Sequence, residues 1–323
     1  MRQIVIGLVG GGTLIFMTSH IPYPFWKKIA LPFFLLTFLL ALLVFSPLGH
    51  MHGGARRWVL IFGQSFQPSE FLKFGFLVYL SSWLASRKED ISSFKFGLFP
   101  FLIIISFVGI LLIMEPNMST LLVIAFTALS LFYIAGGRFR QIATIFLIGA
   151  ILITIAISFL HLQYLQDRIM VFLDPTHDPQ NSGYQITQSL ISFGSGGIFG
   201  RGFGMSIQKF NYLPEPTGDS IFAVIGEEFG FLGTVGLIGL FLLFLCRGLF
   251  VASKTNDNFG RLLGSGIAIM IVAQSFMNMA AMIGIFPLTG LPLLFISQGG
   301  SALAITLAEV GVLLNISKYR KDR

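Results

Sequence analysis

The chain has 323 residues, of which 54% are hydrophobic and only 11% are charged, and its mean hydropathy is +0.83. Soluble domains carry about a quarter charged residues, so this composition excludes a soluble globular protein and indicates an integral membrane protein. The formal net charge is +7, but the basic residues are dispersed over short loops without a basic patch, which argues against nucleic acid as a partner. Attraction to anionic membrane lipids is the secondary effect that this charge predicts.

Apolar runs of about 17 to 26 residues recur along the chain, each long enough to cross a hydrocarbon core of about 30 Å as a helix. We count nine, near residues 3–19, 29–48, 70–86, 96–114, 118–136, 142–161, 221–246, 262–286 and 292–316. Solid apolar runs favour helices over a barrel, whose strands alternate. The first run lacks a small-residue cleavage site, so we expect a retained helix rather than a signal peptide. The predicted fold is all-α, a single polytopic membrane domain over residues 1–323.

Basic residues predict the orientation of this domain. If the C-terminus is cytoplasmic, that side holds most of the 21 Lys and Arg residues, namely Lys27, Lys28, Arg87, Lys88, Lys95, Arg138, Arg140, Arg247, Lys254, Arg261, Lys318, Arg320, Lys321 and Arg323. This bias favours a cytoplasmic C-terminus, and an odd number of helices then places the N-terminus outside.

One long polar segment, about residues 161–220, interrupts the apolar chain and is predicted to be an extracytoplasmic loop. Long loops between rigid elements commonly carry function. Its glycine-rich run predicts either close backbone approach to a bulky substrate or a flexible connector. Asp219, at its end, precedes a predicted helix, so it is either an N-cap of that helix or a general base outside the membrane.

Ionisable residues also collect at the start of the third apolar run. Ser69 is a predicted N-cap with Pro68 before it, and Glu70 and Lys73 share one helical face. Charges at the membrane edge are costly, so this pair should face the bundle or a wet cavity. Two interpretations stay open: a structural ion pair, or a group in which Lys73 helps to attract a phosphorylated substrate.

Other polar residues give weaker signals. Glu115 ends the fourth run, and Glu227 and Glu228 begin the seventh, where adjacent carboxylates are predicted to stabilise a helix N-terminus. His50 and His52 form a pair without a nearby third ligand, so no metal site is predicted. The chain has no GxSxG, Walker A, HExxH or dinucleotide-binding motif. Catalysis would therefore rest on carboxylates and basic groups. No cofactor is identifiable, and a requirement for a divalent cation such as Mg²⁺ stays open.

Five motifs between residues 53 and 317 resemble one known family. They are GARRW, FQPSEFLK, DP with NSGYQITQSLISFGSGGIFGRGFG, QKFNYLPEPTGDSIFAVIGEEFG, and GIFPLTGLPLLFISQGGSA with a later GVLLNIS. In this order they resemble the SEDS proteins (shape, elongation, division and sporulation), the peptidoglycan glycosyltransferases of FtsW and RodA type. The QK before Tyr212 and the VIGEE resemble the FtsW and SpoVE branch, which serves division and sporulation.

The resemblance implies an enzyme of the cytoplasmic membrane that polymerises lipid II, as donor and acceptor, into glycan strands on the outer face. It implies a class B penicillin-binding protein, a transpeptidase, as partner. The family's catalytic aspartate follows its LPE segment and corresponds to Asp219. Such a base takes the proton of an acceptor hydroxyl as it attacks the anomeric carbon, with inversion. The outward cations available for the lipid pyrophosphate are Arg56, Arg57, Lys73 with its partner Glu70, Arg201 and Lys209.

The sequence also departs from the family pattern. The family usually has ten helices, and the chain aligns as though the first were absent, through a late start or a loss. Asn117 stands where an aspartate is common, Ser220 where an aromatic residue is usual, and Gln298 where a tyrosine is usual. Two alternatives to the polymerase remain. A lipid II flippase would depend on Glu70 and Lys73, whereas a scaffold for the transpeptidase would need neither the pair nor Asp219.

Overall fold

A computed structural model describes residue 7 and residues 9–52, 55–61, 64–87, 90–159 and 163–319. Gly53, Gly54 and Lys88, which entered the sequence predictions, lie outside the described residues, as do residues 320–323. The chain divides into two compact units. Unit 1 comprises Met1–Gln141, Phe244–Ala273 and Gly299–Arg323, and unit 2 comprises Ile142–Leu243 and Gln274–Gln298.

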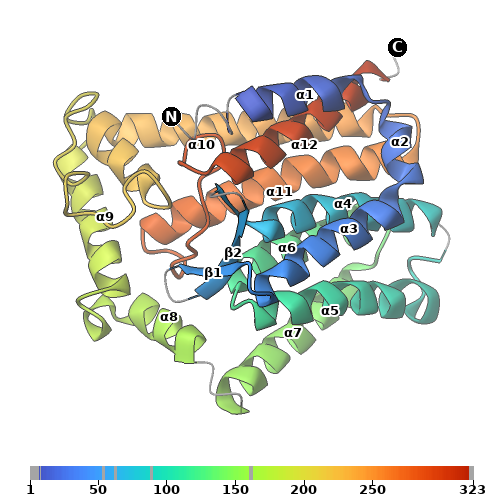
Figure 1. Cartoon of the computed structure of the whole chain (residues 1–323), viewed down its shortest axis with the longest axis horizontal. Helices are drawn as coiled ribbons and strands as arrows, with labels where there is room; N and C mark the ends of the chain where they lie inside the picture. The colour runs from blue at the N-terminus through green and yellow to red at the C-terminus, as the bar shows by residue number, and fades with distance from the viewer. Residues whose placement is uncertain are drawn as a thin grey trace. The chain divides into compact units, whose positions relative to one another are not determined.

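Unit 1 is built mainly from helices, which are labelled in Figure 1. They are α1 (Gly11–His20), α2 (Tyr23–Lys28), α3 (Ala30–Leu42), α4 (Pro68–Ser86), α5 (Phe99–Met114), α6 (Met118–Ile134) and α12 (Gly300–Lys318), with short turns at Leu43–Phe45 and Phe94–Leu98. The C-terminal part of α10 (Ile221–Ser253) and most of α11 (Asn258–Met282) also belong to this unit. Helices α1 and α12 lie side by side, because Gly311 leaves room for Thr18, whose hydroxyl donates to the carbonyl oxygen of Ala308 at 2.9 Å. Satisfying a hydroxyl in this way is what an apolar helix interface requires.

Helix α4 is deeply buried in its N-terminal half. Its residues from Pro68 to Val78 are buried, apart from the partly exposed Phe71, so the helix has apolar contacts on most sides rather than on one stripe. Gly75 lets α3 approach, since a Cβ there would collide with Thr37. Glu70 and Lys73 therefore lie within packed protein.

A three-stranded antiparallel sheet precedes α4, and the sequence analysis did not predict it. Its strands are β1 (Gly49–His52), β2 (Ala55–Ile61) and β3 (Gln64–Phe66), in the order β1-β2-β3. His50 pairs with Trp58, and Val59 pairs with Phe66. Strands this short give no clear alternation of polar and apolar residues, which is why the segment is hard to distinguish from a loop. The mostly helical membrane fold is confirmed, with this sheet as an addition.

Unit 2 contains most of the segment that we predicted to be a loop. It holds most of α7 (Phe139–Phe159), then α8 (Gln163–Leu173), a short turn at Pro175–His177, α9 (Ser182–Gly196) and irregular chain up to Ser220. Helix α9 buries Gly183, Ile186, Ser189, Ser192 and Gly196, which are spaced three or four residues apart. This polar segment is therefore largely structured, because small residues at helical spacing allow α9 to pack despite its low hydrophobicity.

Helix α10 (Ile221–Ser253) is broken at Gly230, where φ is 66° and ψ is −162°. The glycine-rich chain after α9 docks into this break, with Arg201 N donating to Glu227 O and Phe231 N to Gly197 O, both at 2.9 Å. Side chains would prevent this approach, since a Cβ on Gly200 would collide with backbone atoms of α10. In the described structure these glycines bring backbone against backbone, which differs from a flexible connector.

Each of the nine predicted apolar spans contains a helix within the part of the chain that the structure describes. By length and composition, Phe94–Met114, Ile221–Ser253, Asn258–Met282 (α11) and Gly300–Lys318 could each cross a membrane. The last boundary was wrong: residues 292–299 are irregular, and α12 begins only at Gly300. Pro292 lacks an N–H for helical bonding, and the N–H groups of Leu293 and Gln298 bond to a side chain and to a distant loop instead.

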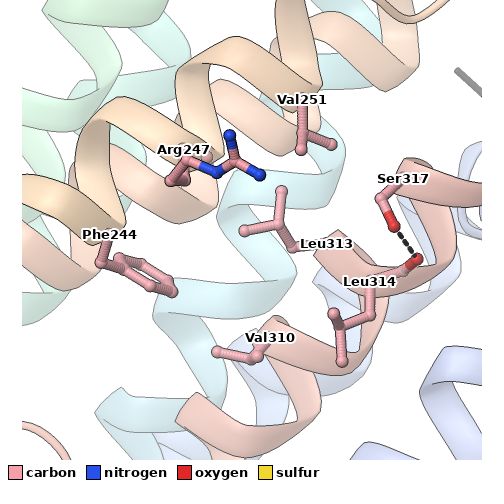
Figure 2. Close-up of a pocket in the computed structure, with 8 residues that line it drawn as sticks. Phe244, Arg247, Val251, Val310, Leu313, Leu314 and Ser317 are labelled. Carbon is pink, nitrogen blue, oxygen red and sulfur yellow. Dashed lines mark hydrogen bonds between the residues drawn. The ribbon is translucent and has the colours of Figure 1, made fainter.

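A cavity of about 380 Å³ lies in unit 1 between the C-terminal parts of α10 and α12. Figure 2 shows Phe244, Arg247 and Val251 on the α10 side of the cavity and Val310, Leu313 and Leu314 on the α12 side. None of the candidate site residues lines it. The candidate chemistry therefore has to be sought elsewhere.

Candidate active site

Asp219 lies on a tight turn that leads directly into α10. The N–H groups of Gly218 and Ser220 both donate to the carbonyl oxygen of Glu215, at 2.9 and 3.3 Å, and Glu215 adopts a positive φ of 46°. Before the turn, the buried Leu213 packs with Ala223 and Val224 of α10. These contacts fix both ends of the turn on the first residues of the helix, so the backbone of Asp219 is held in place.

The segment before α12 clamps this turn from a second direction. Gln298 N donates to Thr217 O at 2.7 Å, and the Thr217 hydroxyl donates to Gln298 Oε1 at 2.8 Å. The hydroxyl of Ser297 donates to Gly218 O at 2.6 Å, and it accepts a bond from Leu293 N at 2.7 Å. Gln298, one of the departures from the family pattern, thus has a defined role in holding the turn.

Helix α11 supplies a third support. The amide nitrogen of the buried Asn278 lies 2.7 Å from the carbonyl oxygens of both Asp219 and Leu291. One side chain therefore joins the turn before α10 to the segment before α12. Preorganisation of this kind is what a catalytic side chain requires of its surroundings.

The carboxylate of Asp219 has weak hydrogen-bond donors. Gln185 Nε2, on α9, lies 3.3 Å from Asp219 Oδ1 and 2.9 Å from the hydroxyl oxygen of Ser220. The Ser220 hydroxyl is itself 3.5 Å from Asp219 Oδ1. The small Ser220, at a position where the family usually has an aromatic residue, leaves space for this contact. In the part of the chain that the structure describes, the side-chain partners of Asp219 are thus Gln185 and Ser220.

Burial raises the pKa of Asp219 from 3.8 to about 6. The hydrogen bond from Gln185 opposes this rise, and the negative charge of Glu215 adds to it. A carboxylate with a pKa near 6 is ionised at neutral pH, yet it is a stronger base than an exposed aspartate. This is the range in which general bases work best.

An arginine that the sequence analysis did not single out lies beside this carboxylate. Gly290 is exposed and has a φ of +62°, and a Cβ placed on it would lie 3.8 Å from Arg168 Nη2 and 4.0 Å from Asp219 Oδ2. Arg168 comes from α8, and its Nη1 is 3.5 Å from the carbonyl oxygen of Thr289. A cation and the candidate base therefore flank the same open glycine.

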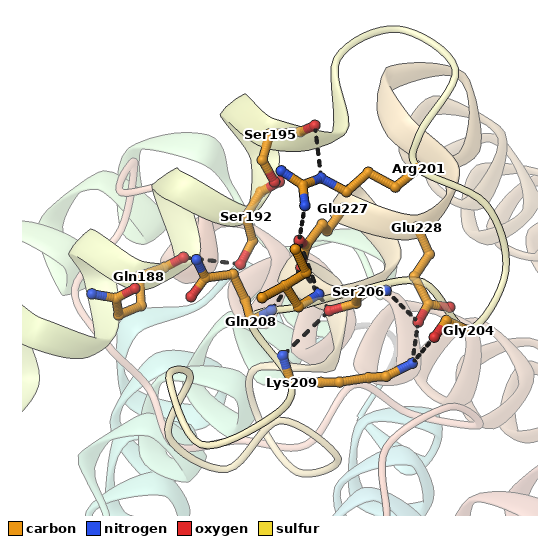
Figure 3. A network of polar contacts seen from close by, with 11 residues as sticks. Gln188, Ser192, Ser195, Arg201, Gly204, Ser206, Gln208, Lys209, Glu227 and Glu228 are labelled. Carbon is orange, nitrogen blue, oxygen red and sulfur yellow. Dashed lines mark hydrogen bonds and ion pairs between the residues drawn. The ribbon is translucent and has the colours of Figure 1, made fainter.

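Glu227 and Glu228 form a separate polar network, shown in Figure 3. Glu227 accepts bonds from the Ser206 hydroxyl at 2.6 Å and from the N–H groups of Ile207 and Gln208 at 3.1 and 3.2 Å. Glu228 pairs with Lys209 Nζ at 2.7 Å. The sequence analysis predicted that these carboxylates stabilise a helix N-terminus. In the structure they are the seventh and eighth residues of α10, and their side chains hold the loop at residues 206–209.

The two cations predicted from this loop have carboxylate partners in the same network. Arg201 Nη1 is 3.6 Å from Glu227, and Lys209 Nζ also donates to Gly204 O at 2.7 Å. Figure 3 shows both side chains directed toward α10 residues. This placement gives Arg201 and Lys209 a structural role, while their contact with substrate stays a prediction.

In unit 1, the predicted pair of Glu70 and Lys73 forms, with Glu70 Oε2 2.9 Å from Lys73 Nζ and both side chains buried. Glu309 of α12 is also buried and interacts electrostatically with Glu70 and Lys73. Ser69 is not an N-cap: α4 begins at Pro68 after Gln67, and the Ser69 hydroxyl instead accepts a bond from Asn117 Nδ2 at 3.1 Å. Proline suits the first helical position because no N–H is needed there.

The remaining predicted cations lie on β2. Arg57 donates through Nη2 to the carbonyl oxygen of Pro116, next to the buried Glu115, whereas Arg56 is exposed. Among the described residues, His, Cys, Asp and Glu side chains form no group of three or more that could hold a metal ion. Unit 2 thus brings Asp219 together with Gln185, Asn278 and Arg168, while unit 1 holds Arg57 and the Glu70–Lys73 pair.

Comparison with known proteins gives consistent matches. Residues 1–322 match a family described as cell cycle protein, whose members are FtsW, RodA and SpoVE. The chain is 40% identical over 314 residues to a probable peptidoglycan glycosyltransferase FtsW of Geobacter sp. (strain M18), covering 97% of this chain and 84% of that protein. It is 36% identical over 321 residues to stage V sporulation protein E of Bacillus subtilis (strain 168), covering 99% and 87%.

Two solved structures are similar over the whole chain. One comes from work on the structural coordination of polymerization and crosslinking by a peptidoglycan synthase complex, with a TM-score of 0.83, 29% identity, and coverage of 100% of this chain and 90% of that one. The other is the rod shape determining protein RodA of Thermus thermophilus, with a TM-score of 0.72, 27% identity, and coverage of 100% and 88%.

Proposed function

The chain belongs to the FtsW, RodA and SpoVE family of cell cycle proteins, and we propose that it polymerises lipid II into glycan strands with Asp219 as the general base. Its family and relatives identify it as a peptidoglycan glycosyltransferase of the SEDS family that serves division or sporulation. The observation that carries the proposal is the Asp219 turn, whose backbone is held from three directions and which bears one partly buried carboxylate.

The reaction that this site supports is a direct displacement. The acceptor hydroxyl of one lipid II attacks the anomeric carbon of another, the bond from that carbon to the pyrophosphate oxygen breaks, and its electron pair leaves with the lipid pyrophosphate. Asp219 takes the proton of the attacking hydroxyl. This step inverts the anomeric carbon and needs no covalent enzyme intermediate, so one base and a stabilised leaving group are sufficient.

The raised pKa of Asp219 suits this role. At pH 7 a carboxylate with a pKa of about 6 is mainly ionised, so it is ready to accept a proton. The leaving pyrophosphate requires positive charge, for which Arg56, Arg57, Lys73, Arg201 and Lys209 are the predicted cations. A divalent cation such as Mg²⁺ could share this task, and its removal by a chelator during polymerisation tests that requirement.

The proposed partner is a class B penicillin-binding protein that cross-links the new strands, a proposal supported by the similarity to a structure of a peptidoglycan synthase complex. We place the protein in the cytoplasmic membrane as a single multi-pass domain over residues 1–323, with the segment 161–220 outside and the C-terminus inside. A reporter fused to the C-terminus should read cytoplasmic, and one inserted at the exposed Asn181 should read external. Readings on the same side would overturn this orientation.

The central experiment compares purified Asp219→Asn with the parental protein in polymerisation of labelled lipid II, each with and without the partner. Asparagine keeps the size of the side chain but cannot accept the proton, so the rate should fall by about 10² to 10⁴ fold. Asp174→Asn is the matched control: Asp174 is an exposed carboxylate in the same polar segment that caps a short turn through Thr176. Its rate should stay near the parental one. A parental rate for Asp219→Asn would refute the assignment of the base.

A lipid II flippase is the second candidate, and the buried Glu70–Lys73 pair with Glu309 nearby is the observation that favours it. Charges buried among helices are typical of transport pathways. Lipid II translocation in vesicles separates the two functions. A flippase should lose translocation in Lys73→Met and keep it in Asp219→Asn, whereas the polymerase should lose polymerisation in Asp219→Asn. A scaffold for the transpeptidase would tolerate both variants.

A further inference from the structure

Unit 2 contains only three Lys or Arg residues in its sequence, namely Arg168, Arg201 and Lys209. Arg201 pairs with Glu227, and Lys209 pairs with Glu228. Both pairs hold the loop at residues 206–209 on α10, as the hydrogen bonds of Glu227 show. Arg168 comes from a different element, α8, and its Nη1 lies 3.5 Å from the carbonyl oxygen of Thr289.

The position of Arg168 is defined by Gly290. The point that a Cβ would occupy on this glycine lies within 4.0 Å of both Arg168 Nη2 and Asp219 Oδ2. Gly290 is exposed, so the space between the two groups opens to the surface instead of being filled by a side chain. Its positive φ of +62° is a conformation that a residue with a Cβ adopts at a cost. The backbone here thus leaves an open space that both a cation and a carboxylate border.

We propose that Arg168 binds the pyrophosphate of the lipid-linked sugar donor, across Gly290 from Asp219. The proposal rests on the proposed glycosyltransferase function and adds to it a residue that contacts the leaving group. A guanidinium can bind two phosphate oxygens at once, which makes arginine suited to a diphosphate. In this arrangement Arg168 stabilises the negative charge that develops on the pyrophosphate as its bond to the anomeric carbon breaks.

In the displacement, the acceptor hydroxyl attacks the anomeric carbon as the pyrophosphate leaves. Arg168 Nη2 and Asp219 Oδ2 each lie within 4.0 Å of one point over Gly290, so both groups can act on a single donor bound there. The proton moves from the acceptor hydroxyl to Asp219, the electron pair moves to the pyrophosphate, and Arg168 undergoes no covalent change.

A purely structural role is the competing interpretation, because Arg168 Nη1 also lies near the carbonyl oxygen of Thr289. Two substitutions separate the roles. Arg168→Gln removes the charge, whereas Arg168→Lys keeps the charge and loses the bidentate geometry, and neither side chain reproduces the guanidinium contact with the Thr289 carbonyl. A structural role predicts lower thermal stability in both variants. The proposed role predicts a larger loss of rate in the uncharged Arg168→Gln than in the charged Arg168→Lys.

The test measures kcat and KM for lipid II polymerisation, together with inhibition by inorganic pyrophosphate. We expect Arg168→Gln to lower kcat/KM by about 10² to 10³ fold, to keep its unfolding temperature, and to need at least about tenfold more pyrophosphate for inhibition. Arg168→Lys should fall between it and the parental protein. Arg138→Gln, which removes an exposed arginine of unit 1, is the control for loss of one positive charge.

Each outcome has a distinct meaning. If the parental protein and its partner make no glycan, the proposed function itself fails. If the parental protein polymerises and Asp219→Asn does not, but Arg168→Gln keeps parental kcat/KM and pyrophosphate inhibition, then only the role of Arg168 is refuted. If both Arg168 variants lose rate together with unfolding temperature, and pyrophosphate inhibits the lysine variant as it does the parental protein, the residue is a structural tie and the inference is again refuted.

Discussion

Two groups of carboxylates in unit 2 lie close in sequence but have opposite surroundings. Glu227 accepts three hydrogen bonds, and Glu228 forms an ion pair with Lys209 at 2.7 Å, so both carboxylates are occupied in holding the loop at residues 206–209. Asp219 has one amide donor at 3.3 Å and a hydroxyl at 3.5 Å, so burial dominates and raises its pKa.

The difference shows how a fold separates structural from reactive carboxylates. Hydrogen-bond donors and cations favour the charged form, whereas desolvation without such donors disfavours it. The backbone of Asp219 is held firmly by Asn278 and by the neighbours of the turn, while its carboxylate is left with weak partners. Rigidity of the main chain and reactivity of the side chain are thus supplied by different contacts.

The largest expected effect on the contrast between Asp219 and the Glu227–Glu228 pair comes from Asp219→Asn, which should change both the polymerisation rate and the unfolding temperature. Because the folded protein raises the pKa of Asp219, its contribution to stability is fully present below the unfolded pKa of 3.8 and is lost as the pH rises through about 6. At pH 7.5 the ionised group therefore destabilises the fold by about 1 to 3 kcal/mol. The asparagine variant should lose 10² to 10⁴ fold in rate and unfold at a higher temperature at this pH.

Thermal unfolding in detergent at pH 7.5 and at pH 4.5 tests whether Asp219→Asn raises or lowers the unfolding temperature. The gain in unfolding temperature of Asp219→Asn should shrink at the lower pH, since the parental aspartate is then protonated. A variant that is less stable than the parental protein at both pH values would show that Asp219 is a structural residue, such as a helix cap.

Substitution of Glu227 should have the opposite effect on stability and lower the unfolding temperature. Glu227→Ala leaves the Ser206 hydroxyl and the N–H groups of Ile207 and Gln208 without their acceptor, which should cost about 1 to 3 kcal/mol of stability. The unfolding temperature should fall, and protease should cleave the loop near residue 206 faster. Glu227→Gln is the milder control because it keeps an acceptor oxygen. If Glu227→Ala kept parental stability and lost only the rate, the network would belong to the reacting site.

The sequence predicted the positions of the helices well, but it predicted the contacts between distant segments poorly. Apolar runs of membrane length depend only on local composition, so each predicted span contains a helix in the described chain. We interpreted Ser69 and the glycine-rich run from local sequence rules, but contacts with residues distant in sequence determine the structure of both. The Ser69 hydroxyl bonds to Asn117, and the glycine-rich run packs against the break in α10 at Gly230. Local patterns do not report such contacts.

The candidate site shows the same limit. Asp219 could be predicted because it lies within a motif, but the residues that surround it and hold its backbone could not. Arg168 lies 121 residues before Thr289, and Asn278 lies 59 residues after Asp219, so no spacing rule connects them. Arg201 and Lys209 were predicted from sequence to be substrate cations, and only the structure shows that they pair with Glu227 and Glu228.

A smaller effect is expected from closing the gap over Gly290. Gly290→Ala adds a methyl group within 4.0 Å of Arg168 and Asp219, and its positive φ adds strain of about 1 to 2 kcal/mol. Gly284→Ala is a matched control, since Gly284 has a φ of +72° and no atom within 4 Å of its Cβ position. Both variants should lose similar stability, but only Gly290→Ala should lose polymerisation, by about tenfold. Equal rates in the two variants would mean that substrate does not occupy this gap.

The smallest expected effect concerns the electrostatic neighbour of Asp219. The negative charge of Glu215 disfavours the ionised form of Asp219 and so raises its pKa. Glu215→Gln removes that charge, which should lower the pKa of Asp219 and move the acid limb of the kcat/KM profile to lower pH. More of the base is then ionised near pH 5.5, so the rate there should rise by up to roughly threefold, with little change at pH 8. Asp174→Asn, remote in sequence and exposed, should leave the limb in place. An acid limb that stays put or moves upward in Glu215→Gln would show that a group other than Asp219 controls the rate.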